Sequence, residues 1–365
     1  MKQETEQLLV IVVAVAIGCI LGIVLNRFFE PGFIIIAIVG FFAGLFLSVI
    51  LHELGHLLFG RLSGCQFSSF RVMKWLWVKG DGGKIRMKKS AGIKGIGGQC
   101  MMEPPADEKD FRFVLYNAGG ALVNIITCAA LLIPAFLIDD NVVTPILAGI
   151  GVSSLTIGIV NIIPLSLSGF PNDGRNIVEA KKSADAEHGM YALLKTNSEM
   201  SKGKRLSDYD EAAFSVSENA DINNHFVAML IMMRSSQLEE KGEFRQSYRE
   251  LKRLEHSDLS PIYKNQLIMS LIFHELVYFE DDPSYNSARE RMESKANDKM
   301  FKNLLKMKYP NFILVQAAIK AFLDKDTDKA RELIAQAREL TPSLQNPGME
   351  YSIMLALDRL EARLN

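Results

Sequence analysis

Long uncharged hydrophobic runs fill the first half of the chain and are absent from the second half. Four of these runs are long enough to cross a bilayer as a helix, which takes about 20 residues. They cover residues 8–25, 32–60, 113–138 and 143–167. The pattern predicts a multi-pass membrane protein with about four transmembrane helices. The first run does not fit a signal peptide, because its leader is more acidic than basic.

Charged residues divide the chain near Gly174, since about 25 of them precede this residue and about 58 follow it. We therefore predict a transmembrane domain at residues 1–174 and a soluble α-helical domain at residues 175–365. The mean hydropathy of +0.11 averages over these two parts. A net charge of -1 gives no electrostatic case for nucleic-acid binding, and four Cys without paired spacing exclude a disulfide scaffold.

The Lys and Arg residues between the second and third hydrophobic runs predict the orientation in the membrane. Residues 61–94 hold nine basic residues and one acidic residue, whereas the link between the third and fourth runs carries Asp139 and Asp140. Short basic loops stay on the cytoplasmic side of a membrane. We therefore expect both termini to be cytoplasmic and the protein to lie in the cell membrane. Cys65 and Cys100 would then be in a reducing compartment, where a disulfide is not expected.

The second hydrophobic run contains the pattern H-E-x-x-H, formed by His52, Glu53 and His56. Residues four apart share one face of a helix, so both imidazoles can reach one Zn²⁺ with the Glu beside them as general base. The alternative is two stray His in an apolar helix. Uncompensated polar groups at membrane depth are costly, and a bound metal would compensate the ligands. The pattern therefore favours a zinc site inside the membrane, near the cytosol.

A catalytic zinc site takes a third protein ligand and keeps one position open for water. Asp173 follows the fourth hydrophobic run and emerges on the same predicted side as the two His. Asp139 and Asp140 fall on the opposite side. The alternative for Asp173 is a turn residue, because Asn-Asp-Gly is strong turn chemistry, and both descriptions can hold together.

With these residues in place, the chain resembles the site-2 protease family of intramembrane zinc metalloproteases over about residues 30–175. The resemblance rests on HELGH at 52–56, on Asn161-Ile-Ile-Pro164 followed by Asp173-Gly174, and on Asn117-Ala-Gly-Gly120-x-x-x-Asn124. One departure is the longer stretch between Asn161 and Asp173. Another is Gly119-Gly120, where many relatives have Gly-Pro.

The resemblance implies peptide hydrolysis within or near transmembrane segments of membrane-bound regulators or signal peptides. His52, His56 and Asp173 would hold Zn²⁺, and Glu53 would act as general base and acid. Asn161 and Asn124 would contact the substrate. The alternatives are a helix-bending Asn161 beside Pro164 and an interhelical hydrogen-bonding Asn124, and for Asn124 the second is favoured.

The loop at residues 62–112 carries the pattern of a β-hairpin around a Gly-rich turn at 80–83. Its Trp and Lys residues are typical of the lipid headgroup region. One hypothesis is that an edge strand here, at residues 70–78, holds the substrate extended by strand addition. The alternative is a hairpin that only seals the site from lipid. The apolar positions flanking the turn are Phe70, Val72, Trp75, Trp77, Val78, Ile85 and Met87.

The second half of the chain shows a helical pattern in which three stretches repeat in outline, at residues 232–256, 271–295 and 319–340. Ser247, Ala288 and Ala330 occupy matching small positions, which would allow close helix packing. The pattern resembles tetratricopeptide-like repeats with a longer period. Such arrays offer a concave surface for a protein or peptide partner. The alternative is an appendage without a partner.

Two further functions compete with the protease. One is a non-catalytic membrane anchor that presents the helical domain as a scaffold, which predicts a degraded metal site. The other is an ion pathway, and four spans without an inverted repeat argue against it. The partners we expect are a transmembrane protein or peptide substrate and the lipid bilayer.

Overall fold

The computed structural model describes residues 31–89, 97–138, 142–167, 169–279, 282, 287–344 and 346–364, together with the single positions 12, 18 and 22. The protein is mainly helical with a small antiparallel sheet. Two compact units are present, one made of residues 1–78 and 86–181 and the other of residues 79–85 and 182–365. The first predicted span, residues 8–25, lies outside the described residues apart from three isolated positions.

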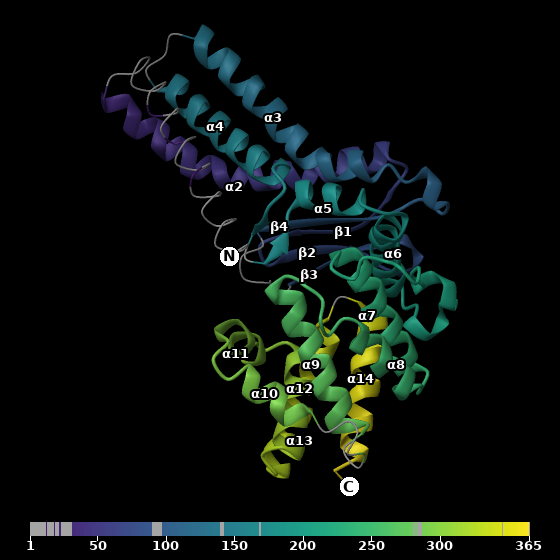
Figure 1. Ribbon diagram of the computed structural model, residues 1–365. Coiled ribbons are helices and arrows are strands. Elements are labelled where there is room, and N and C mark those ends of the chain that lie inside the picture. The colour runs from purple at the N-terminus through teal and green to yellow at the C-terminus, as the bar shows by residue number, and fades with distance from the viewer. Residues whose placement is uncertain are drawn as a thin grey trace. The chain divides into compact units, whose positions relative to one another are not determined.

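Three long apolar helices form the first unit, and each packs against the other two (Figure 1). They are α2 (Pro31–Leu62), α3 (Phe113–Leu137) and α4 (Val143–Ile162). By length and composition, all three can cross a membrane, as predicted for the second, third and fourth runs. The helix α4 ends before the predicted 167, because Pro164 disfavours helical backbone in the preceding residue.

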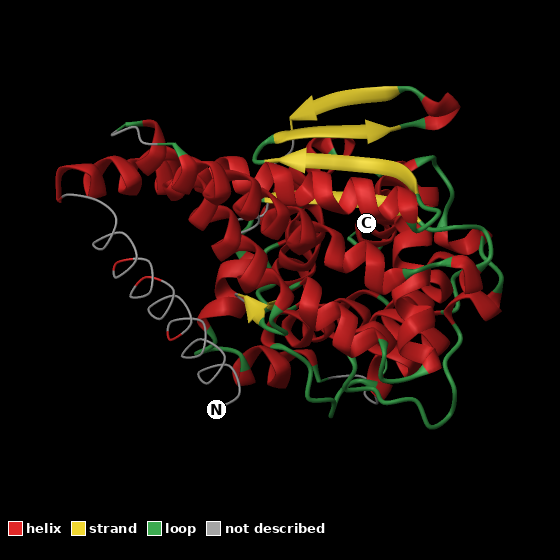
Figure 2. Ribbon diagram, turned by 90° about the horizontal axis from the view of Figure 1, so that it is seen from above, coloured by secondary structure: helices red, strands yellow, loops and turns green. Residues whose placement is uncertain are grey.

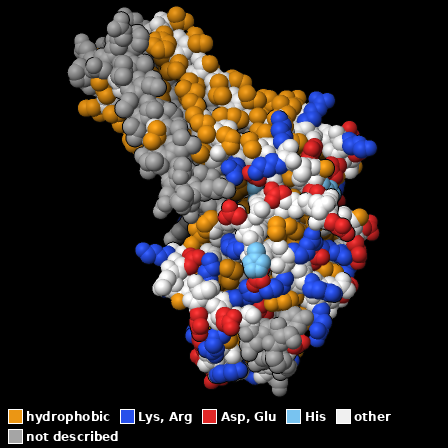
Figure 3. All heavy atoms as spheres, in the orientation of Figure 1, with side chains coloured by type: hydrophobic (Ala, Val, Ile, Leu, Met, Phe, Trp, Pro, Cys, Tyr) orange, Lys and Arg blue, Asp and Glu red, His pale blue; other side chains and the backbone are white. Residues whose placement is uncertain are grey.

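The outward surfaces of these helices are apolar. Large side chains such as those of Phe42, Phe46, Ile126 and Leu137 are exposed. Hydrophobic side chains gather over α3 and α4, whereas charged side chains cover the helices of the second unit (Figure 3). An exposed apolar surface of this kind suits contact with lipid tails rather than water.

A four-stranded antiparallel sheet follows α2 in the order β3-β2-β1-β4 (Figure 2). Its strands are β1 (Gln66–Val72), β2 (Trp75–Lys79), β3 (Ile85–Lys89) and β4 (Gly98–Glu103). The predicted hairpin around the Gly-rich turn is the pair β2–β3. However, β1 and β2 both lie inside the sheet, so the prediction of an edge strand at residues 70–78 is wrong. The chain returns through β4 to pair with β1, a long-range pairing that local pattern does not specify.

A second, very small hairpin links α4 to the short helix α5 (Asp173–Ala180). Its strands are β5 (Ser166–Leu167) and β6 (Phe170–Pro171). This hairpin accommodates the additional residues between Asn161 and Asp173. The chain therefore leaves the end of α4, turns back and begins α5 beside it.

In the second unit, α7 packs against α8, α9 packs against α8, α10 and α12, and α12 packs against α13. Ser247, Ala288 and Ala330, the predicted small positions, are buried. The repeat character of this unit stays a prediction. The helices are α6 (Ala184–Ser201), α7 (His225–Glu240), α8 (Phe244–Arg253), α9 (Pro261–Val277), α10 (Ala288–Ser294), α11 (Lys299–Leu305), α12 (Pro310–Phe322), α13 (Thr327–Leu340) and α14 (Pro347–Ala362).

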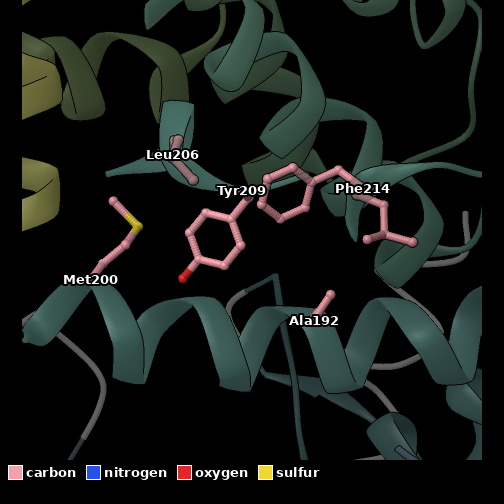
Figure 4. Close-up of a cluster of buried hydrophobic side chains, with 6 residues drawn as sticks. Ala192, Met200, Leu206, Tyr209 and Phe214 are labelled. Carbon is pink, nitrogen blue, oxygen red and sulfur yellow. The ribbon is translucent and has the colours of Figure 1, made fainter. Parts of the chain in front are cut away.

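The last helix, α14, packs against α6, α12 and α13. Near its end, Arg359 donates hydrogen bonds to the backbone oxygens of Glu239 and Glu240 at the end of α7. The helix thus joins the first and last parts of the second unit. One core cluster of this unit contains Ala192, Met200, Leu206, Tyr209, Phe214 and Leu230 (Figure 4).

Candidate metal centre

Three potential metal ligands converge from two segments that are far apart in the sequence. Asp173 Oδ2 lies 2.9 Å from His52 Nε2 and 3.2 Å from His56 Nε2. The two Nε2 atoms are 3.2 Å apart. Both His are buried and Asp173 is largely buried. The three side chains could hold one metal ion, and they form the one such group among the residues that the structure describes.

The spacing of these atoms fits a small tetrahedral cation. Zinc bonds of about 2.0–2.1 Å to His and carboxylate place neighbouring ligand atoms of a tetrahedron roughly 3.3 Å apart. The observed separations among His52, His56 and Asp173 are close to this value. Two imidazoles and one carboxylate are also a donor set of the kind found in catalytic zinc sites, which keep a fourth position open.

The tautomer of His52 is set by a hydrogen bond on the far side of its ring. Its Nδ1 lies 2.8 Å from Asn124 Oδ1. The amide of Asn124 is oriented by its Nδ2, which donates to the backbone oxygen of Ser48 and to Ser154 Oγ, each at 3.0 Å. Because Oδ1 can only accept, His52 donates from Nδ1 and presents the lone pair of Nε2 to the centre.

His56 is held in the same way by the backbone of α3. Its Nδ1 lies 2.9 Å from the carbonyl oxygen of Tyr116, which again can only accept. With both Nδ1 atoms protonated, two Nε2 lone pairs and a carboxylate oxygen of Asp173 point at one place. Three converging acceptors repel one another, and a cation between them removes that repulsion. The three side chains are therefore arranged so that they could hold a metal ion.

Glycines on α3 allow the helices to approach closely enough for these contacts. A Cβ atom added at Gly120 would lie 2.5 Å from His52 Cε1, and one at Gly55 would lie 2.5 Å from the Gly119 oxygen. Any larger residue at Gly120 would therefore displace the imidazole. The Gly119-Gly120 pair thus fits the packing of this chain.

Glu53 lies beside the ligands and faces the start of β4. A Cβ added at Gly98 would lie 2.7 Å from Glu53 Oε1, so this strand position has room only for glycine. The backbone of Cys100 hydrogen-bonds to the Glu53 carboxylate, and the Cys100 oxygen accepts a hydrogen bond of 2.9 Å from the Tyr116 hydroxyl. The strand β4 therefore covers and positions the candidate general base.

Asp173 is positioned by the residue that precedes it. Asn172 caps α5 by accepting from the Arg175 N–H, and it also accepts from the Leu165 N–H. Its Nδ2 donates to the backbone oxygens of Val160 and Ile163, each at 2.7 Å. These four bonds fix the start of α5 against the end of α4. The predicted Asn-Asp-Gly turn chemistry is thus present together with the ligand geometry.

The charge of Asp173 is favoured by its neighbours. Burial alone would raise the pKa of the Asp173 carboxyl, but a positive charge beside it, such as that of protonated His56 and His52 with the hydrogen bonds they then donate, holds the pKa well below its usual value. Asp173 is therefore ionised at neutral pH, as a metal ligand must be.

The two asparagines predicted to contact the substrate differ in position. Asn124 is completely buried, and its amide is used by hydrogen bonds to α2 and α4, so we assign it a positioning role, in line with the favoured alternative. Asn161 is partly buried and donates from Nδ2 to the Ile157 oxygen one turn earlier. Its contact with a substrate stays a prediction.

Several contributors to the site were not singled out from the sequence. Tyr116 holds His56 through a backbone oxygen, which leaves no residue-type signal. Ser48 and Ser154 are small polar residues in apolar helices, a recognisable feature of interhelical contacts. Asn172 could have been found as an N-cap three residues before a helical N–H.

No match for this chain is found among protein-family models, curated proteins or solved structures.

Proposed function

We propose that the protein is an intramembrane zinc metalloprotease similar to the site-2 protease family. The observation that carries this proposal is the convergence of His52, His56 and Asp173 with Glu53 beside them. The sequence resemblance named the same four residues. The proposal includes a cytoplasmic position for the sheet and for the helical second unit.

In the proposed reaction, each residue has a separate task. Zinc held by His52, His56 and Asp173 would act as a Lewis acid that makes a water more acidic and polarises the scissile carbonyl. Glu53 takes a proton from this water and later delivers one to the leaving amine. The backbone of Cys100 holds the Glu53 carboxylate, so the base keeps its place when it changes protonation.

The level of the centre along α2 supports cleavage near the membrane boundary. The helix has 32 residues, so it is about 48 Å long at 1.5 Å per residue. A hydrocarbon core is about 30 Å thick. His52 and His56 lie in the last third of α2, and Arg61 follows in its final turn. A substrate cut here would be cleaved near one end of its transmembrane segment, in reach of water.

The decisive variant is Glu53→Gln, which keeps the shape of the side chain and removes its basicity. We expect zinc to remain at about one ion per chain and cleavage of membrane proteins to fall by about 10²–10⁴-fold. The matched control is Glu332→Gln on α13, where the carboxylate is exposed. Zinc would be measured by elemental analysis and cleavage by comparing membrane proteins of cells with either variant.

Two results would contradict the proposal. A Glu53→Gln protein that still cleaves would remove the assigned base. Purified wild-type protein without zinc would instead favour the alternative, a non-catalytic membrane anchor that presents the helical unit.

A further inference from the structure

One side of the sheet carries exposed aromatic and aliphatic residues. On β2, Trp75 and Trp77 alternate with Leu76 and Val78, which are buried on the other side of the sheet. The Lys89 ammonium lies 5.6 Å from the centre of the Trp75 ring, so Lys89 belongs to the same side as Trp75. Successive strand residues alternate between sides, which adds Met87. We call Trp75, Trp77, Met87 and Lys89 the tryptophan face.

The tryptophan face lies on the side of the sheet that meets α2. Val72 pairs directly with Trp75 on one neighbouring strand and with Gly98 on the other. Directly paired residues share one side of a sheet. A Cβ at Gly98 would point into Glu53, 2.6 Å from its Cγ. The helix α2 thus covers this side at β4, and the tryptophan face continues the same side outward across β2 and β3.

Away from α2, this side is left uncovered by the residues that the structure describes. Trp75 is 45% exposed and Met87 is 58% exposed. Met73, at the adjoining β1–β2 turn, is also 58% exposed. On the opposite side, Leu76 and Val78 are below 10% exposed. Apolar groups of this size gathered on one face mark a surface for protein or lipid rather than for water.

The position of the sheet along α2 favours lipid. The strand β4 runs beside α2 from Glu53, next to Gly98, to Gly60, where an added Cβ would lie 3.0 Å from Met102 Cγ. This is the last third of a helix about 18 Å longer than a hydrocarbon core. The sheet therefore lies at the level where a bilayer passes from acyl chains to headgroups. Trp and Lys are the residues enriched at that level.

The charge of the face selects the type of lipid. Lys89 lies within it and Lys74 adjoins it at the turn, whereas Arg86 and Lys88 of β3 point to the opposite side of the sheet. Residues 72–89 contain six basic residues and one acidic residue, which is Asp81 in the β2–β3 turn. We propose that the tryptophan face inserts into the headgroup layer of an anionic lipid bilayer. This inference rests on α2 crossing the membrane, and it holds with or without zinc and proteolysis.

The chain offers a direct probe, because Trp75 and Trp77 are its two tryptophans and both belong to this face. The full-length Glu53→Gln protein would be reconstituted into vesicles of phosphatidylcholine and phosphatidylglycerol. In separate samples, one or the other lipid carries bromine near the headgroup end of its acyl chains. We expect bromine to quench the Trp emission, and brominated phosphatidylglycerol to quench more strongly than its mole fraction predicts.

The lysines test the anionic preference. A Lys near an anionic surface contributes a factor of about five, so Lys74→Gln with Lys89→Gln should lower the preference for phosphatidylglycerol by up to that factor per residue. The matched control is Lys302→Gln with Lys306→Gln, two exposed lysines in α11 and directly after it, which should leave the preference unchanged.

Each other outcome overturns the proposal or its lipid class. Trp emission that bromine leaves unchanged and that aqueous acrylamide quenches would place the face in water. Emission that resists both quenchers would show that protein covers the face, either another part of the chain or a second copy. Equal quenching by both brominated lipids would exclude an anionic preference.

Discussion

The α2–α4 bundle and the helical second unit bury opposite kinds of residue. In the bundle, helices meet at small residues, and a Cβ added at Gly40 would lie 2.9 Å from the Ile146 oxygen. Large side chains such as Phe42 point outward. In the second unit the large side chains are inside, with Phe214 and Leu230 almost fully buried (Figure 4).

The difference is the one expected if the bundle meets lipid, as proposed, and the second unit meets water. In water, burying large apolar groups drives packing. In lipid this drive is missing between helices, so close backbone approach and interhelical hydrogen bonds hold them together. The interior of the bundle is consequently free for polar residues such as Asn124, Ser48 and Ser154, all completely buried.

The largest expected effect comes from making one substitution in both units. Phe214→Ala should lower the free energy of unfolding of the second unit by about 3–5 kcal/mol, because it removes a fully buried ring and leaves a cavity. Phe42→Ala, at a side chain that is 66% exposed in the bundle, should change stability in lipid bicelles by under about 0.5 kcal/mol. Denaturation of the full-length protein, followed separately for each unit, measures both.

A large loss of stability for Phe42→Ala would mean that its ring is packed against protein. The lipid-facing assignment of that surface of α2 would then be wrong, and the contrast between the units would fail there.

An intermediate effect is expected at Asn124, a polar residue of the bundle interior that would orient a ligand of the proposed zinc ion. Asn124→Ala removes the acceptor that fixes the tautomer of His52. Loss of such a partner typically lowers metal affinity about 10–100-fold. Competition with a zinc chelator measures the affinity. The control is Asn197→Ala in α6, whose side chain is a hydrogen-bond partner of Asn346 within the second unit, and it should leave zinc affinity unchanged.

If Asn124→Ala binds zinc as tightly as the wild type and loses only cleavage, the positioning role is contradicted. The prediction that Asn124 contacts the substrate would then be preferred.

The sequence identified site residues best where their spacing along a single helix already brings them together. His52 and His56 share a helical face because they are four residues apart, which local geometry dictates. The bounds of α3 also follow closely from the hydrophobic run at 113–138. Asp173 was singled out by its chemistry and its predicted side of the membrane, without knowledge of how the chain returns to the two His.

The remaining contacts depend on pairings between distant segments. The order β3-β2-β1-β4 brings Gly98 and Cys100 of β4 to Glu53. The sequence pattern of the loop instead led to the hypothesis of a substrate-binding edge strand at residues 70–78. Asn172 makes four hydrogen bonds that exist only after β5 and β6 have turned the chain. Such contacts are set by tertiary packing, which the local pattern of hydrophobic and polar positions does not encode.

The smallest expected effects on the free energy of unfolding come from removing one polar contact in each unit. Arg338 of α13 donates to Asp358 and Glu361 of α14 at exposed positions, and such ion pairs contribute about 0.2–1 kcal/mol. Ser153 Oγ lies 3.1 Å from Ser48 Oγ between α4 and α2, and hydrogen bonds inside membrane bundles average about 0.6 kcal/mol. Arg338→Gln and Ser153→Ala should thus lower the free energy of unfolding by similar amounts. The size of the change alone does not distinguish the two kinds of contact.

Their dependence on salt does separate them. Charges in water are screened over about 3 Å at 1 M salt and about 30 Å at 0.01 M, so the cost of Arg338→Gln should nearly vanish when unfolding is measured at high salt. The contact of Ser153 is neutral and buried, so the cost of Ser153→Ala should be the same at both salt concentrations. Equal salt dependence for the two variants would mean that water reaches Ser153, and the interior of the bundle would then have to be treated as solvated between α2 and α4.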